Sequence, residues 1–288
     1  MDSGLGIGGL SLSKDEVASS SFDLFSGIEI ENSIQKANKI VVRPIAATGS
    51  KGPFKFFFPA DPTKWTDCET IRLSGKVALK KNRAGVLSDF SDAENEISTV
   101  NNFFQSLFSS IDCTINGVEI TDPSKNWYPY KAYLETLLSY SKSTKEGRLR
   151  SHCFIKDTPQ KYDSIATINQ DNQRTADSDN DGYKLRRDFF HNSKTRYFNI
   201  PLHVDICTLR KYLPPNTALE LTFHRSPDAF SLLSPFSTEQ CEILIEDVML
   251  SLTRYTPSPQ IKNFHSNKLS SLKRQLLPID RTLIKTYT

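Results

Sequence analysis

The residues best suited to metal chemistry lie in the segment DSDNDGYKLRRD. They are Asp177, Asp179, Asp181 and Asp188. Their spacing resembles that of a calcium-binding loop, with Asp188 in place of the final bidentate glutamate, because hard cations prefer carboxylate oxygens and Gly182 permits a sharp bend. The flanking sequences do not predict the helix pair expected around such a loop, and Asp, Asn and Gly are also ordinary turn residues. Two alternatives follow, a calcium site or a solvated acidic loop.

Basic residues form two groups that could contact phosphates. The first includes Arg186 and Arg187, and the second includes Lys273 and Arg274. Aromatic residues are not interleaved with either group, so a nucleic-acid interface has weak support. A formal charge of +3 and a pI near 8.5 are too mild to indicate such a partner by themselves. Solvated charge, or ion pairs with a neighbouring subunit, is the plainer interpretation.

Catalytic and cofactor motifs are not apparent in the sequence. The five histidines lack metal-ligand spacing, and we find no nucleophile elbow, P-loop or dinucleotide fingerprint. The five cysteines are odd in number and include no C-x-x-C pair, which favours a reducing compartment over a disulfide framework. Neither a signal peptide nor a long apolar run is present. We therefore expect an intracellular protein without cofactor, enzymatic activity or membrane span.

The elements that would position these residues are mostly strands. Alternating and apolar runs predict them at about 39–45, 53–58, 69–80, 111–115, 118–120, 194–200, 218–224, 241–254 and 282–287. A phase slip near Asp247 predicts a bulge in the strand at 241–254. The 18 Phe and 10 Tyr supply bulky core side chains suited to strands. The pattern favours an all-β sandwich of two antiparallel sheets with short helical insertions at 99–109, 130–142 and 204–212.

The stretch from residue 101 to residue 140 has the clearest local signals. Asn116-Gly117 lies between two alternating runs and predicts a tight hairpin. The segment before it places Phe103, Phe104, Leu107 and Phe108 on one side of a short helix, either as core or as an interface patch. In the following helix Tyr130, Tyr133 and the leucines near them recur at helical spacing, which predicts one buried face. The two tyrosines would serve either core packing or an interface.

The chain is expected to form one domain with an arm. Residues 1–21 are rich in Gly and Ser and predict a flexible N-terminal arm. Residues 22–288 would form the single folded domain. Within it, 156–193 reads as a long polar loop, which is usually functional or disordered.

Several blocks resemble one protein family when they are taken in order. They are SFDLFS near Phe22, GPFKFFFP at Gly52, NNFFQSLFSSIDCTINGVEI from Asn101, YPYKAYLETLLSYS from Tyr128, KDTP at Lys156, LHVDIC at Leu202 and SPDAF at Ser226. This succession resembles the hexon-like capsid proteins of Polinton/Maverick elements and the related adintoviruses. The resemblance runs from about residue 22 to residue 288.

The resemblance implies a jelly-roll domain and a structural role by self-assembly. In that family a second jelly roll follows the first, and the pair trimerises into a pseudo-hexagonal capsomer. This chain would correspond to the N-terminal jelly roll, so the partners implied are further copies of itself, with a trimer favoured, and other capsid proteins. Localisation would be the virion. The alternatives are a single jelly-roll penton or minor capsid protein, and a truncated or domesticated copy that serves the host as a binding module.

Overall fold

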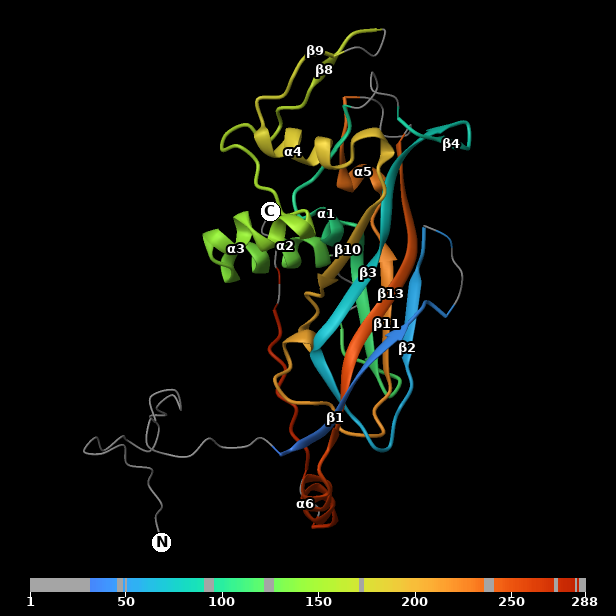
Figure 1. Ribbon diagram of the computed structural model, residues 1–288, viewed down its shortest axis with the longest axis vertical. Coiled ribbons are helices and arrows are strands. Elements are labelled where there is room, and N and C mark those ends of the chain that lie inside the picture. Colours follow the sequence, from blue (N-terminus) through green and yellow to red (C-terminus); the bar gives the residue numbers. More distant parts are fainter. Residues whose placement is uncertain are drawn as a thin grey trace, which may run out of the picture.

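The computed structural model describes residues 32–45, 49, 51–90, 96–121, 127–170, 174–235, 241–271, 274–282 and 284. Within these residues two antiparallel sheets form a sandwich (Figure 1). The first sheet has the order β1 (Ile34–Val42), β13 (Cys241–Pro257), β3 (Trp65–Arg83) and β10 (Arg196–Pro201), and β4 (Val86–Ser88) pairs with β3. The second has the order β2 (Phe54–Phe58), β11 (Leu219–Arg225), β6 (Phe108–Ile115) and β7 (Val118–Glu119). The expected all-β sandwich is confirmed.

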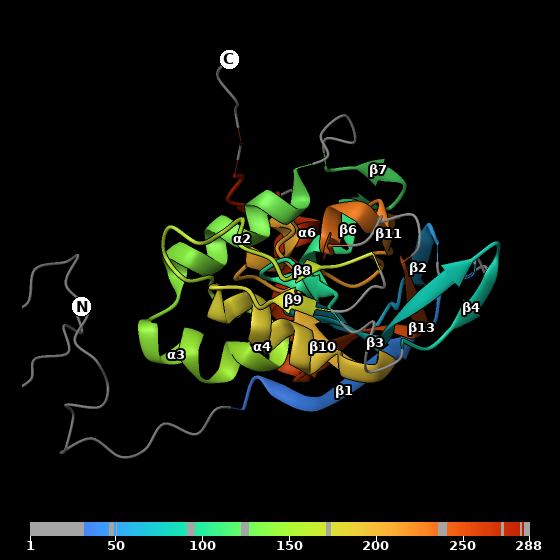
Figure 2. The same cartoon turned by 90° about the horizontal axis from the view of Figure 1, so that it is seen from above.

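Short helices and two small sheets complete the described fold. The helices are α1 (Phe103–Ser106), α2 (Tyr128–Ser139), α3 (Lys142–Glu146), α4 (Asp181–Phe189), α5 (Asp228–Ser231) and α6 (Pro259–Ser270), with 3-10 turns η3 (Arg148–His152), η4 (His191–Ser193) and η5 (Asp205–Thr208). β12 (Leu232–Leu233) pairs with β5 (Ser98–Thr99), and β8 (Thr167–Ile168) pairs with β9 (Arg174–Ala176). Helices α2, α3 and α4 gather beside the sheets, whereas α6 lies at the opposite end of the long axis (Figures 1 and 2).

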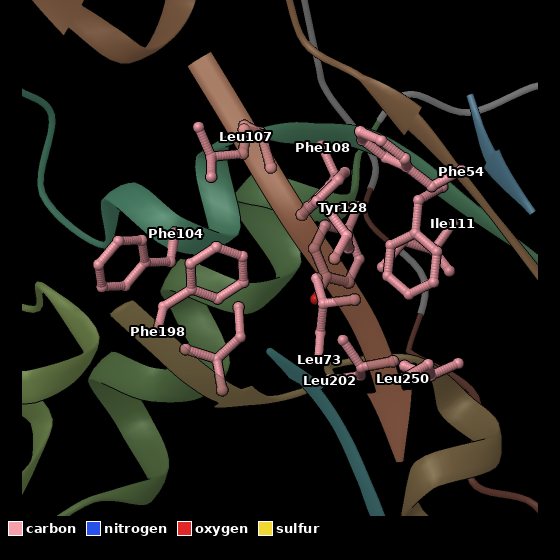
Figure 3. Close-up of a cluster of buried hydrophobic side chains, with 14 of the residues drawn as sticks. Phe54, Leu73, Phe104, Leu107, Phe108, Ile111, Tyr128, Phe198, Leu202 and Leu250 are labelled. Atoms are coloured by element: carbon pink, nitrogen blue, oxygen red, sulfur yellow. The ribbon is translucent and has the colours of Figure 1, made fainter. Parts of the chain in front are cut away.

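The core lies between the two sheets and is rich in aromatic rings. Strand β2 shows how the sequence builds it: Phe54, Phe56 and Phe58 are buried, and the two residues between them are exposed, as the period of two in a strand requires. The ring of Phe223 lies 5.4 Å from that of Phe56 and 5.2 Å from that of Phe108, both edge to face. Figure 3 shows part of this core around Phe108 and Tyr128.

Two local backbone predictions are confirmed. Asn116 and Gly117 join β6 to β7 with φ values of 49° and 79°, as a tight hairpin turn between two strands requires. In β13 the pairing with β3 shifts register between Glu246 and Met249, and Asp247 has a φ of 50°. This irregularity is the expected bulge.

Other sequence predictions need correction. The helix expected at 99–109 shortens to α1, because Phe108 already pairs in β6 and faces the core. The segment 156–193 is not a plain loop, since it carries β8, β9, α4 and η4. In the strand expected at 282–287, Thr282 and Ile284 are outside any strand, and the other residues lie outside the described part, as do those of the arm at 1–21.

Candidate assembly surface

Helix α2 packs on the sandwich through a narrow face. Pro129 stands in its first turn, where a missing backbone N–H costs nothing. Tyr128, Ala132 and Thr136 are spaced by four residues, and all three are buried. The hydroxyl of Tyr128 donates a hydrogen bond to the side-chain oxygen of Gln105 at 2.6 Å. These contacts fix how the helix is rotated.

The opposite face of α2 is apolar and exposed. Tyr130, Leu134 and Leu138 are also spaced by four residues, and their exposed fractions are 49%, 44% and 80%. The ring of Tyr130 lies 5.8 Å from that of Trp127 and 6.0 Å from that of Phe230 in α5. We call these five residues the α2 patch. Contiguous exposed apolar surface of this kind is typical of a protein contact site.

Part of the sequence prediction for α2 is therefore wrong. Tyr130 was expected on the buried face and is half-exposed. Tyr133 is intermediate in exposure, and its ring lies 6.1 Å from that of Phe154. The buried face is instead built from Tyr128, Ala132 and Thr136.

Polar contacts on the flank of α2 hold this orientation. Lys131 pairs with Asp205 of η5, and the carboxylate of Glu135 lies 2.7 Å from Nδ1 of His203. Burial alone would raise the pKa of Glu135, but the contact with His203 and the charge of Lys131 outweigh it and hold the pKa below its usual value. The helix thus turns its charged flank toward η5 and its aromatic face outward.

The phenylalanine cluster before the hairpin belongs to the core. Phe103, Phe104, Leu107 and Phe108 are at most 1% exposed. The ring of Phe104 stacks on that of Phe198 from β10 at 5.1 Å (Figure 3). Of the two alternatives, the structure supports core packing and leaves no surface on these residues for a partner.

The four aspartates of the expected calcium loop do not come together. Asn180 caps α4 by accepting hydrogen bonds from the N–H groups of Gly182 and Tyr183, so the helix starts at Asp181. Asp181 and Asp188 are then about 10 Å apart along the helix axis, at 1.5 Å per residue. Among the described residues no group of three or more metal-ligating side chains occurs. The calcium interpretation is not supported by this arrangement.

Each of these four carboxylates pairs with a lysine or arginine side chain. Asp177 pairs with Arg187 at 2.8 Å, Asp179 with Lys161 at 3.3 Å, Asp181 with Lys184 at 2.7 Å and Asp188 with Arg187 at 3.4 Å. Burial raises the pKa of Asp177, but hydrogen bonds from Arg187 and from the Ser178 N–H outweigh it, and the pKa is lowered overall. Gly182 has a different role from the one expected, because a Cβ there would lie 2.4 Å from the backbone oxygen of Lys156.

Arg186 and Arg187 are structural residues and not phosphate contacts. Arg186 is fully buried, and its guanidinium donates to the carbonyls of Thr99 and Ile155 and to Asp157 Oδ1 at 2.6 Å. Arg187 is 7% exposed and pairs with Glu96 at 2.8 Å. The two arginines fasten α4 to β5 and to the chain at 155–157. The phosphate prediction for this group is wrong, because both side chains are enclosed and paired.

The second basic group is only partly described. Arg274 is exposed in the segment after α6, and Lys273 lies outside the described residues. Arg274 lines a cavity with Arg210, Lys211 and Lys268, and rings of Trp65 and Tyr212 lie in the same wall. The aromatic residues that the sequence lacked near this group therefore come from distant parts of the chain.

The cysteines offer little nucleophilic chemistry. All five are free thiols, and four of them are buried. Burial raises the pKa of Cys153 and of Cys241 to about 11, and that of Cys207 to about 12, so the thiolate form is scarce at neutral pH. Among the described helices, none is long and apolar enough to cross a membrane.

Comparisons with known proteins bear on the fold. No protein-family model matches the chain, and no curated protein matches it in sequence. A chain in the cryo-EM structure of the Sputnik virophage matches in structure with a TM-score of 0.50 and 11% identity, over 86% of this chain and 53% of that one. The chain has the jelly-roll fold. This match confirms the jelly-roll part of the expected fold class. Because the sequence identity is only 11%, the match is evidence for the fold and not for the function.

Two further solved structures match less well. The crystal structure of PBCV-1 VP54 fitted into a reconstruction of the virophage Sputnik has a TM-score of 0.38, with 10% identity over 83% of this chain and 46% of that one. The crystal structure of mavirus major capsid protein has a TM-score of 0.41, with 13% identity over 88% of this chain and 54% of that one. This jelly-roll chain spans about half the length of each of these three proteins.

Proposed function

We propose that this chain is a structural subunit of a viral-type capsid that acts by self-assembly and has no catalytic role. The observation that carries the proposal is the match to a chain of the Sputnik virophage, which extends over 86% of this chain at a TM-score of 0.50. Fold alone does not define function. The α2 patch adds an independent reason, because it is exposed apolar surface without a partner among the described residues.

The same proposal includes the group of genetic elements from which the chain derives. The ordered sequence blocks from Phe22 to Ser226 resemble the hexon-like capsid proteins of Polinton/Maverick elements and adintoviruses. We assign the chain to that virus-derived, transposon-encoded group, as the N-terminal jelly roll at 22–288 behind an arm at 1–21. Its place would be the virion.

Assembly would bring copies together through the α2 patch. When such contacts are related by closed rotational symmetry, the subunits form a finite oligomer. We favour a trimer that associates with other capsid proteins. Tyr130 and Leu138 are the most exposed residues of α2 within the patch. Each would bury apolar surface against a neighbouring subunit, and removal of that surface from water favours association.

The test is the solution mass of the full chain by light scattering over a range of concentrations. The proposal predicts a mass that rises from monomer to trimer as concentration increases. A pentamer would favour a penton-like or minor capsid component, and a monomer at every concentration would contradict self-assembly and favour a host binding module.

A matched pair of variants locates the contact. Tyr130→Ser with Leu138→Gln removes two exposed side chains of the α2 patch. Tyr197→Ser with Leu87→Gln removes the same side-chain types, which are 73% and 41% exposed on β10 and β4. The first variant should shift the trimer midpoint to higher concentration by tenfold or more, and the second should leave it unchanged. Equal shifts in both would contradict the role of the patch.

A further inference from the structure

A cavity of about 390 Å³ lies at the end of the sandwich that carries α6. Its walls come from the first residue of β3, from the connection between η5 and β11, from α6 and from the segment that follows α6. The volume falls within the range of roughly 300 to 1,000 Å³ that is typical of small-ligand pockets. The elements that meet here are widely separated in sequence, since β3 begins at Trp65 and α6 ends at Ser270.

The charged side chains that line this cavity are all positive. Arg210, Lys211, Lys268 and Arg274 line it, and none of the lining residues is Asp or Glu. Within the part of the chain that the structure describes, none of these four side chains has an ion-pair partner, in contrast to the arginines of α4. Lys268 also lies over the ring of Phe264, at 5.3 Å from its centroid, a contact that leaves its charge uncompensated. Four cations without a carboxylate partner around one cavity favour an anionic ligand, and Arg and Lys are the side chains that contact phosphates in nucleic acids.

Aromatic rings form another part of the same wall. Trp65 lines the cavity, and its ring lies 5.7 Å from that of His265 in α6, which helps to hold it in place. Tyr212 is 41% exposed, and its ring is supported by that of Tyr255 at 4.9 Å. Flat rings that are fixed from behind and open in front can stack with nucleobases regardless of sequence.

We propose that this cavity binds single-stranded nucleic acid, with backbone phosphates on the four cations and a base stacked against Trp65 or Tyr212. A double helix is a poor fit, because its bases are stacked inside and cannot reach rings that lie within a cavity. A free nucleotide carries the same phosphate and base groups, so the test compares it with the oligonucleotide as a competitor. The inference goes beyond a capsid role and does not depend on self-assembly.

The test measures binding of the full chain to a fluorescein-labelled oligo-dT of about 12 nucleotides, within the usual site size of single-strand binding folds, by fluorescence anisotropy at low and high salt. A duplex of the same length, ATP and inorganic triphosphate serve as competitors. The pocket variant is Lys268→Glu with Arg274→Glu, both exposed residues. The control is Arg148→Glu with Arg150→Glu, which makes the same charge change at two exposed positions of η3. Light scattering on the same samples records the oligomeric state, so effects on binding and on assembly are separated.

The proposal expects the pocket variant to bind oligo-dT at least tenfold more weakly than the wild type, and the control to stay within twofold. The slope of log K against log salt should fall in magnitude by about 1.4 in the pocket variant, at about 0.7 for each phosphate that is no longer neutralised. Tyr212→Ala should weaken oligo-dT binding threefold or more and leave competition by triphosphate unchanged.

Other outcomes would reassign the site or remove it. Unlabelled ATP that competes as well as the oligonucleotide would overturn the single-strand assignment in favour of a free nucleotide. Equal weakening in both charge variants, stronger binding of duplex, or no binding even at low salt would overturn the inference altogether.

Discussion

Removal of Arg186 should be among the most destabilising single changes in α4. The side chain is fully buried and donates to two backbone carbonyls and to Asp157. In Arg186→Met the new side chain has a comparable length but no donor, so both carbonyls and one carboxylate oxygen are left without this donor. Helix α4 would lose its main polar attachment to the chain at 155–157.

The magnitude follows from what remains around the missing guanidinium. Removing one partner of a buried ion pair costs about 3 to 5 kcal/mol. Asp157 keeps a hydrogen bond from the side chain of Asn180 at 2.8 Å and is 18% exposed, which places the cost at the lower end. We expect the free energy of unfolding to fall by about 3 kcal/mol, roughly a hundredfold in the folding equilibrium.

Urea unfolding followed by tryptophan fluorescence measures this change. The matched control is Arg174→Met, because Arg174 also faces carboxylates, at 3.6 Å from Glu96 and 3.3 Å from Asp177, but its side chain is 44% exposed. An exposed ion pair contributes less than about 1 kcal/mol. Equal destabilisation in the two variants, or a change below about 1 kcal/mol in Arg186→Met, would refute the structural role of the buried arginine.

Three further predictions concern stability. Gly182→Ala should lower the free energy of unfolding by about 1 to 3 kcal/mol in urea, because the added Cβ would lie 2.4 Å from the backbone oxygen of Lys156; an unchanged value would contradict that close approach. Phe223→Ala should cost about 3 to 5 kcal/mol by the same measurement, whereas Phe264→Ala, at a residue that is 56% exposed, should cost less than about 0.5 kcal/mol. The pKa of Asp177 is lowered in the folded protein, so the contribution of Asp177 to stability is complete above about pH 4 and is lost as the pH falls through that lowered pKa. Between about pH 7 and pH 3, the urea midpoint of Asp177→Asn should therefore fall less steeply than that of the wild type. Parallel profiles for the two proteins would contradict the pairing with Arg187.

Local chemistry explains which elements could be predicted from the sequence. The Asn116-Gly117 hairpin depends on positive φ values that these residue types favour, and the alternation in β2 depends on a period that the strand itself imposes. The bulge near Asp247 was visible as a phase slip in the apolar pattern. Each of these features is decided within a few residues of chain.

Long-range contacts explain what the sequence could not show. The rotation of α2 is set by Gln105, His203 and Asp205, which contact the helix from other elements, so the apolar pattern alone favoured the wrong face. The aspartates before and within α4 resembled calcium ligands because their partner lysines and arginines could not be identified from spacing. The signal for the α2 patch was present as a second four-residue period at 130, 134 and 138.

Distance in sequence also hid the basic cavity. Arg274 has no aromatic neighbour in the chain, yet the fold places it in one wall with Trp65 and Tyr212. A search for interleaved residues within one segment cannot detect such a site, because its charge and its rings come from separate elements.

Electron microscopy of the purified full chain tests the proposed self-assembly. Class averages of negatively stained particles at concentrations above the transition seen by light scattering should show rings with threefold symmetry. Particles of monomer size alone, at every concentration and salt level, would contradict the assignment of this chain as a self-assembling capsid subunit.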